Sequence, residues 1–203
     1  MKIVQYYSHL NGFEFIKYHK PHVWDELESV INDVDAEKCR TKSSGEARKA
    51  GKTLYSPVDM NKEFLSLFGE RGWSERRVTN WLAEDVTLLR HIMTLEPKDQ
   101  KEMIEAKGLE PLMTYNQTDF VKDRVAVEIQ FGKYSFVAHD LFVKHMSFFI
   151  ADDIDVGIEV VPMKSMEREM SSGVPYYERD LFNLMRQGRG IPAVPIILVG
   201  VAP

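Results

Sequence analysis

Apolar and polar residues alternate strictly over residues 124–131, RVAVEIQF. Because successive side chains of a strand point to opposite faces, this pattern predicts a strand with one face toward the core. Val125 and Ile129 would lie on the core face, and Glu128 and Gln130 would lie together on the other face. The second pair places a carboxylate and an amide side by side.

The rest of the second half alternates between helical and strand patterns. Residues 136–150 and 176–188 have apolar side chains at helical spacing, whereas residues 154–162 and 194–202 are rich in β-branched residues, as strands are. The order strand, helix, strand, helix, strand predicts an α/β fold in which helices cover a mixed sheet.

The first half is predicted to be mainly helical. Residues 22–33 carry apolar side chains at helical spacing, and residues 61–70 form a second segment with Asn61 as its cap. Residues 97–107 begin with proline, which suits the first turn of a helix.

Composition sets the size and class of the protein. A chain of 203 residues with 44% apolar and 28% charged residues fits one domain, with 1–110 as its helical N-terminal part and 111–203 as its core. Cys39 is the only cysteine, which excludes an internal disulfide framework and suits a reducing compartment. The sequence has neither an apolar run of the ~20 residues a membrane span needs nor a signal-peptide pattern, so a cytoplasmic protein is expected.

Charge gives no general indication of a nucleic-acid partner, because the formal net charge is -5. The segment 38–52, KCRTKSSGEARKAGK, is locally basic, with Glu46 as its only acidic residue. Its composition favours a solvated flexible loop. The alternative is a mobile basic arm that closes on phosphates.

Two carboxylates are candidates for a metal site. A turn around Lys122 and Asp123 would fold Asp119 beside Glu128, with the Ile129 carbonyl between them. Hard oxygen ligands of this kind suit Mg²⁺, which is usually bound together with water and substrate phosphate oxygens. The alternative is a solvated glutamate on a polar strand face and an aspartate in ordinary turn chemistry.

The spacing Thr118-Asp119, then Glu128-Ile129-Gln130, resembles the PD-(D/E)xK nuclease signature. The longer stretches NQTDFVKDRVAVEIQFGKYSFVAHDLFVKHM, EMSSGVPYYE and PIILVGVAP are similar to the BglII-like type II restriction endonucleases, and among them to the BstYI-like enzymes. This resemblance implies a restriction-endonuclease-like α/β fold: a mixed β-sheet core flanked by helices, with an N-terminal helical elaboration. It also implies a single endonuclease domain over the whole chain.

The resemblance implies a role for each residue of the signature. Asp119, Glu128 and the Ile129 carbonyl would bind Mg²⁺, which lowers the pKa of a water and offsets charge on the scissile phosphate. Gln130 stands where the signature usually has lysine, and an amide cannot act as a general base. Gln130 would instead orient the attacking water. Glu102 or Glu105 is a candidate for assistance, although a solvated helix face explains both.

The resemblance also implies the partner and the product. A homodimer would cut double-stranded DNA at a palindromic purine-GATC-pyrimidine site, since a two-fold protein matches a two-fold sequence. Cutting after the first base would leave four-base 5′ overhangs with 5′-phosphates. A cognate DNA methyltransferase would be its functional partner.

Two short stretches are candidates for reading the bases. In the first, Gly132 would allow close backbone approach, Lys133 would donate to guanine, and Tyr134 follows them. In the second, Ser171 and above all Ser172 could donate or accept, which suits relaxed reading of the outer base pair. The alternatives are a surface lysine in a turn and a helix cap.

The apolar helix 136–150 could be core or dimer surface. Its residues His139 and His145 are six positions apart and do not share a helical face, so both are interpreted as helix-surface residues.

Two competing functions remain open on sequence. One is a structure-specific nuclease of the same fold, such as a junction resolvase. The other is a DNA-binding protein with a degenerate catalytic site, which the glutamine in the lysine position suggests.

Overall fold

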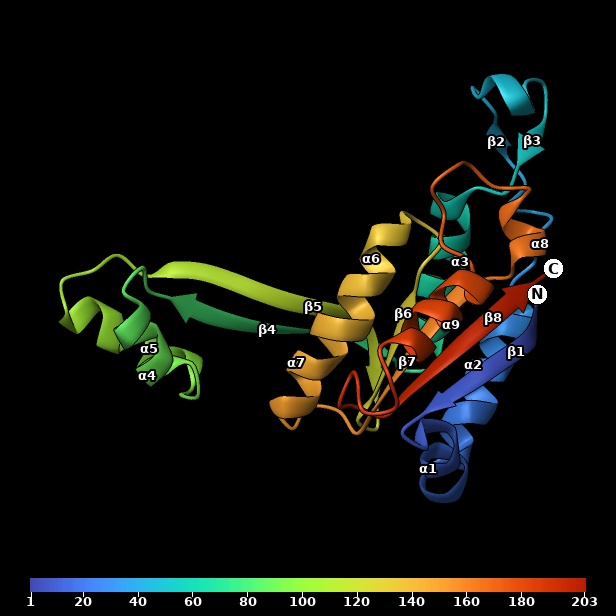
Figure 1. The fold of residues 1–203 in the computed structure, drawn as a ribbon. Helices are drawn as coiled ribbons and strands as arrows, with labels where there is room; N and C mark the ends of the chain where they lie inside the picture. Colours follow the sequence, from blue (N-terminus) through green and yellow to red (C-terminus); the bar gives the residue numbers. More distant parts are fainter. The chain divides into compact units, whose positions relative to one another are not determined.

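A computed structural model describes all residues, 1–203 (Figure 1). The strands are, in chain order, β1 (Lys2–His9), β2 (Lys42–Ser43), β3 (Thr53–Leu54), β4 (Ser74–Leu82), β5 (Leu112–Lys122), β6 (Val125–Ile129), β7 (Val156–Pro162) and β8 (Ile196–Ala202). The helices are α1 (Gly12–His19), α2 (Pro21–Asp33), η1 (Ala47–Lys49), α3 (Pro57–Glu70), α4 (Val86–Ile92), α5 (Pro97–Ala106), α6 (Tyr134–His139), η2 (Asp140–Lys144), α7 (His145–Ile150), α8 (Lys164–Glu167) and α9 (Tyr177–Arg186).

Six strands form one mixed sheet in the order β1-β8-β7-β6-β5-β4. Strands β6, β7 and β8 are parallel, while β5 runs antiparallel to β6, and β1 antiparallel to β8. The predicted α/β class with a mixed sheet is confirmed, and so is each predicted strand of the second half. Strands β2 and β3 form a separate two-stranded hairpin.

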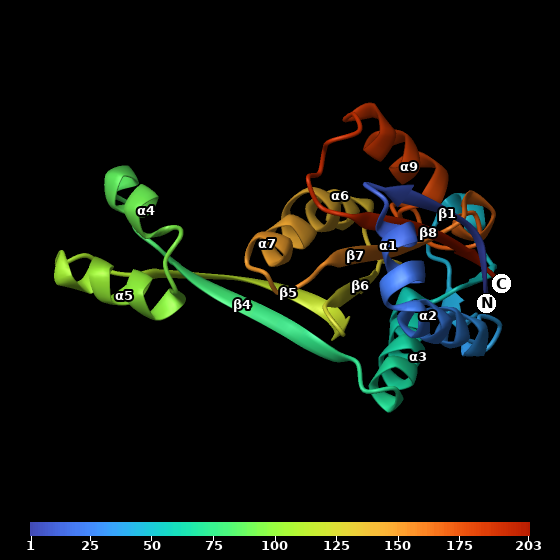
Figure 2. The same cartoon turned by 90° about the horizontal axis from the view of Figure 1, so that it is seen from below.

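One face of the sheet is covered by the N-terminal helices. The side chains of Val125, Val127 and Ile129 share a buried cluster with residues of α2 and α3, among them Leu27 and Phe64. These strand residues lie on the face that their alternation predicts, because every second side chain points the same way. Figure 2 shows α2 and α3 on this side of the sheet.

The opposite face is covered as well, by α6 and α9 (Figure 2). Val137 and Leu141 pack there with Tyr177 against Ile196 and Leu198 of β8. All five residues of β6 are therefore buried. The interpretation of Glu128 as a solvated group on a polar strand face is wrong, because helices cover that face.

The predicted helix over residues 136–150 is one continuous helical run, which begins at Tyr134. Its middle segment, η2, is a π-helix, in which the backbone is wider than in the flanking α6 and α7. Short π segments inside α-helices are frequent at functional sites.

Helix α3 begins one turn earlier than the sequence predicts. Its N-cap is Ser56, whose hydroxyl accepts a hydrogen bond from the backbone N–H of Asp59. Asn61 was expected as the cap and lies inside the helix instead. Serine followed by Pro57 at the first helical position is the more favourable start, since proline has no N–H to leave unpaired there.

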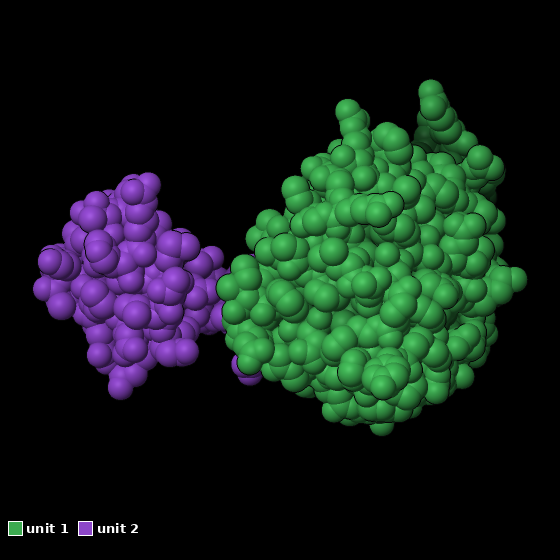
Figure 3. Space-filling view, turned by 60° about the horizontal axis from the view of Figure 1, so that its bottom comes forward, with its two compact units in different colours: residues 1–75, 118–203 green, residues 76–117 purple.

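The chain forms two compact units (Figure 3): residues 1–75 with 118–203, and residues 76–117. The smaller unit holds α4 and α5 around its own apolar cluster, which includes Leu88, Ile92 and Ile104. The sequence patterns do not predict this division. They also do not predict β1 and β4, so the first half is less purely helical than expected.

No helix is long and apolar enough to cross a membrane.

Candidate active site

The hairpin of β5 and β6 turns at two residues with positive φ, Asp123 at 47° and Arg124 at 61°. Such a pair forms the tight two-residue turn that matches the twist of a hairpin. The turn is thus one residue later than predicted, and Arg124 belongs to it rather than to the strand. The register pairs Phe120 with Val127, so the next pair outward brings Asp119 opposite Glu128.

The two carboxylates meet as the sequence predicts. The Asp119 carboxyl is within hydrogen-bonding reach of the Glu128 carboxyl and of the Ile129 backbone. Asp119 remains exposed, whereas Glu128 is only 1% exposed. Partial loss of water raises the pKa of Asp119 even so. Burial, followed by the nearby Asp119 charge, raises the pKa of Glu128 to about 8, although Lys144 opposes the shift.

This pair fits a divalent cation. Glu128 Oε1 is buried and has no hydrogen-bond partner, and two carboxyl groups in contact repel each other when both are ionised. No group of three histidine, cysteine, aspartate or glutamate side chains is arranged to hold a metal. Two carboxylates with open positions are typical of Mg²⁺, which keeps water and takes phosphate oxygens as further ligands. The role of the Ile129 carbonyl stays a prediction.

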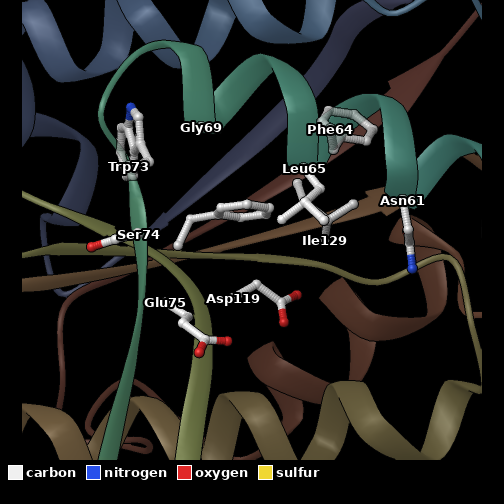
Figure 4. A pocket seen from close by; sticks show the side chains of 10 residues that line it. Asn61, Phe64, Leu65, Gly69, Trp73, Ser74, Glu75, Asp119 and Ile129 are labelled. Carbon is white, nitrogen blue, oxygen red and sulfur yellow. The ribbon is translucent and has the colours of Figure 1, made fainter.

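Glu75 is a carboxylate that the sequence patterns do not single out. It lines a cavity of about 330 Å³ together with Asp119, Phe120 and Ile129. Figure 4 shows the Glu75 and Asp119 carboxylates on the same side of β4 and β5, while Trp73 and the helix α3 lie on the other side. Glu75 lies on β4, which the sequence patterns do not predict as a strand, so its place beside Asp119 could not be foreseen.

A buried lysine lies behind the carboxylate pair. Lys144 Nζ lies 2.8 Å from Glu128 Oε2 and 2.7 Å from Asp140 Oδ1. Burial by itself lowers the pKa of Lys144, but Glu128 and Asp140 raise it well above its ordinary value, so the ammonium stays charged. The other oxygen of Asp140, Oδ2, accepts a hydrogen bond from Gln130 Nε2 at 3.0 Å.

These contacts orient the amide of Gln130. An ionised carboxylate only accepts hydrogen bonds, so Asp140 requires the NH₂ group of Gln130 to face it. Gln130 Oε1 is then available to accept. A Cβ added at Gly132 would lie 3.2 Å from this oxygen, so the glycine leaves it room.

His145 lies deep in the protein, and its interpretation as a helix-surface residue is wrong. Its ring and Glu159 are fully buried, with His145 Nε2 3.5 Å from Glu159 Oε2. Burial lowers the pKa of His145 to about 4 and raises the pKa of Glu159 well above its ordinary value. His145 is therefore neutral near pH 7. His139, in contrast, is exposed as expected.

The two stretches expected to read bases are joined. The backbone N–H of Tyr134 donates to the carbonyl oxygen of Gly173 at 2.8 Å. Lys133 and Ser172 are both exposed on either side of this contact. Ser171 is half-buried beside them. The structure thus brings the two stretches together, while their contacts with DNA stay predictions.

The basic segment 38–52 packs against the second of these stretches. The N–H of Ser172 donates to Glu46 Oε1 at 2.7 Å, and its hydroxyl donates to Oε2 at 2.5 Å. These bonds hold the pKa of Glu46 below its ordinary value. Lys49 Nζ also donates to the carbonyl oxygen of Met170. In the DNA-free protein this segment is therefore neither a free loop nor an isolated arm.

Glu102 and Glu105 belong to the smaller unit and lie on α5. Lys98 pairs with Glu102 at 3.7 Å and Lys101 with Glu105 at 3.8 Å, each one turn away on the same helix. Both glutamates therefore fit the solvated helix face that the sequence favours.

A mixed sheet with two carboxylates meeting on a central hairpin defines the nuclease class that the sequence resembles. The family model for restriction endonuclease BglII/BglIII matches residues 4–201. The chain belongs to this family, and it is a type II restriction endonuclease, a DNA-binding and DNA-cleaving hydrolase. Enzymes of this kind generally depend on a divalent metal.

Two solved structures support the fold. BglII in complex with a DNA 16-mer matches with a TM-score of 0.69 and 20% identity, over 100% of this chain and 79% of that chain. Free BglII matches with a TM-score of 0.58 and 18% identity, over 100% and 80% of the two chains. No curated protein sequence is significantly similar to this chain.

Proposed function

We propose that this enzyme cuts double-stranded DNA at purine-GATC-pyrimidine sites with Mg²⁺, after the first base, and leaves four-base 5′ overhangs with 5′-phosphates. The observation that carries the metal-dependent chemistry is that Asp119 lies next to Glu128, whose buried Oε1 has no hydrogen-bond partner. The cleavage site itself rests on the resemblance to BstYI-like enzymes.

Each residue of the signature has a role in this proposal. Asp119, Glu128 and the Ile129 carbonyl hold Mg²⁺, which when bound lowers the pKa of a water and offsets charge on the phosphate. Gln130 directs its Oε1 toward the attacking water and accepts a hydrogen bond from it, because its NH₂ group is engaged by Asp140. Gln130 orients the water and does not remove its proton.

Glu75 extends this site. Its carboxylate lines the same cavity as Asp119 (Figure 4), where it would accept a hydrogen bond from a water near the phosphate. Glu75 therefore replaces Glu102 and Glu105 as the candidate carboxylate that assists cleavage.

Base reading is assigned to two loops that act together. Lys133 donates to guanine, and Ser172, next to Ser171, contacts the outer base pair, where a hydroxyl tolerates more than one partner. Gly132 and Tyr134 support the first loop. The hydrogen bond between the Tyr134 N–H and the Gly173 carbonyl oxygen supports this proposal, because it places both loops at one location.

A homodimer is part of the proposal, since a palindromic site calls for two equivalent subunits. Exposed apolar side chains on the long helical run support it: Phe136 is 54%, Val143 47% and Ile150 75% exposed. Apolar side chains gathered in one exposed patch often mark a surface that binds another protein. A cognate DNA methyltransferase would protect host DNA from such an enzyme.

Unmethylated plasmid incubated with the protein and Mg²⁺ tests the function. Sequencing of the fragment ends should give GATC overhangs preceded by a purine. Cutting confined to branched DNA would instead favour a structure-specific nuclease, and binding without cutting would favour a degenerate DNA-binding protein.

A further inference from the structure

The buried groups behind the carboxylate pair form one chain of contacts. Lys144 connects Glu128 to Asp140, and Asp140 connects Lys144 to Gln130. The exposed fractions of the side chains are 1% for Glu128, 3% for Asp140 and 12% for Lys144. Two residues of the expected site are therefore each held by a residue outside the signature.

The burial of Lys144 is not explained by a gain in the stability of the folded protein. Taking charged side chains out of water costs several kcal/mol for each ion, so buried ion pairs are weak evidence for stabilisation. They are better explained where they fix a geometry. Here Lys144 is the one lysine or arginine that pairs with Glu128 and Asp140, while His139 Nδ1 lies farther from Asp140, at 3.8 Å.

The helix is deformed where these residues stand. Asp140 and Lys144 are the first and last residues of the π-helix η2, and α-helical geometry resumes at His145. A π segment rotates the following residues relative to a regular α-helix, which changes the direction in which a side chain leaves the helix. This deformation is an observation independent of the contacts themselves.

Lys144 also determines which oxygen of Glu128 is free. It occupies Oε2, and Oε1 is left buried without a hydrogen-bond partner. Asp140 in the same way occupies the NH₂ group of Gln130 and leaves the amide oxygen. Residues of one helix therefore leave Oε1 of Glu128 and Oε1 of Gln130 as the oxygen atoms that can accept further contacts.

We propose that Lys144 and Asp140 are positioning residues of the cleavage site: from η2 they hold Glu128 and Gln130 so that one oxygen of each faces the reacting groups. The proposal rests on the proposed function. The positive charge that the signature usually has at position 130 comes here from the helix, and it acts through other side chains rather than on the phosphate.

The first test compares Lys144→Met, Lys144→Arg and a matched control, Lys122→Ala. Lys122 is also partly buried and lies 2.8 Å from Glu26, but it contacts neither Glu128 nor Gln130. Lys144→Met should lower the single-turnover cleavage rate about 100-fold, the cost of a misplacement near 1 Å. DNA affinity, measured with Ca²⁺, should change by less than about threefold. The interactions lost in this variant act in the transition state and contribute little to binding of the uncut DNA.

The conservative variant separates positioning from simple stabilisation. Lys144→Arg should recover most of the rate, and Lys122→Ala should lose thermal stability without losing cleavage. Positioning is expected to contribute about 100-fold to the rate. If folded Lys144→Met cleaves within about threefold of the wild-type rate, the proposal is overturned.

The second test asks whether Asp140 acts through Gln130. If it does, Asp140→Ala should slow cleavage in the wild-type background and have little further effect in Gln130→Ala. Additive effects of the two changes would refute the connection.

A spectroscopic measurement needs no cleavage. The side-chain amide signal of Gln130 in a ¹⁵N spectrum, assigned by its absence in Gln130→Ala, should shift in Asp140→Ala and in Lys144→Met but not in Lys122→Ala. An unchanged signal in Asp140→Ala would overturn the proposed hold on Gln130. Because the metal-free protein is used, this result stands even if wild type fails to cut GATC sites, and the two failures remain distinguishable.

Discussion

The backbone N–H of Tyr134 donates a hydrogen bond to the carbonyl oxygen of Gly173 at 2.8 Å. Tyr134 begins α6 shortly after β6, the strand that carries Glu128, and Gly173 precedes α9. This hydrogen bond joins the two loops through their backbones. In the proposed function, recognition by the two loops and chemistry on β6 would be connected through a few residues of backbone.

Lys133 and Ser172 should consequently act as a coupled pair. Loss of a good base contact costs about 1–3 kcal/mol, so Lys133→Ala should weaken binding of the cognate site about tenfold or more. The effect of Ser172→Ala should be smaller in the Lys133→Ala background. Binding of oligonucleotides in Ca²⁺, for all four combinations, measures the coupling. Effects that add within about 0.5 kcal/mol would show that the loops read DNA independently.

Removal of either charge from the carboxylate pair should abolish cleavage. Asp119→Asn and Glu128→Gln keep the side-chain shape but remove an anionic ligand, and we expect at least about a thousandfold loss of rate, roughly 4 kcal/mol. DNA binding should be largely kept. Asp123→Asn is the matched control, since Asp123 lies in the turn of the same hairpin. Cleavage retained by Asp119→Asn would reject the metal assignment.

Metal binding should depend on pH through Glu128. Its pKa is raised to about 8 by burial and by Asp119, so at pH 7 the metal-free carboxyl holds a proton most of the time. A cation must displace that proton, and affinity should rise with pH up to about 8 and then level off. Calorimetry in two buffers of different ionisation enthalpy should detect release of nearly one proton at pH 7, and release should disappear in Glu128→Gln. Binding of the metal to wild type at pH 7 without proton release would contradict this pKa.

The central part of the fold could be predicted because its patterns are regular. Strands β6, β7 and β8 combine β-branched residues with turns or helices at both ends, and the helix over 136–150 is too long for a strand. Asp119 meets Glu128 as expected, although the turn between them lies one residue later than the sequence predicts. The strand and helix patterns are local properties, so they are visible in one sequence.

The rest depends on which surfaces become covered. Alternation placed Glu128 on a polar face, and only tertiary packing buries that face under α6 and α9. The sequence does show Asp140 and Lys144 as a charged pair four residues apart on an otherwise apolar helix. The π segment that aims them at Glu128 has no such local signal. The burial of His145 has none either.

Gly157 should be intolerant of even one added methyl group. A Cβ there would lie 2.5 Å from His145 Nδ1 and 2.6 Å from Cγ, against a fully buried ring. Gly157→Ala should destabilise the protein by about 1–3 kcal/mol or more, as overpacking of cores does. Each kcal/mol lowers the melting temperature of a protein of this size by about 2–4 °C.

Gly190→Ala is its control, because nothing lies within 4 Å of an added Cβ at that position. Thermal unfolding of both variants measures the difference. A smaller cost of Gly157→Ala in the His145→Ala background would identify the ring as the obstacle, while equal costs in both backgrounds would point to a different cause.

Glu46 should weaken DNA binding in the wild-type enzyme. Its carboxylate accepts both hydrogen bonds of Ser172 and places a negative charge within the basic segment 38–52, so DNA must displace it to reach the serine. Glu46→Ala should therefore tighten binding about fivefold, near 1 kcal/mol, as expected for a net hydrogen-bond contribution. Glu46→Gln removes the charge and keeps one acceptor, so it should give a smaller gain. Ser172→Ala removes the hydroxyl hydrogen bond and keeps the backbone one, so the gain from Glu46→Ala should be smaller in that background, and its charge contribution should fade as salt is added. Titrations at two salt concentrations separate the two contributions, and weaker binding by Glu46→Ala would mean that Glu46 supports the DNA-bound form instead.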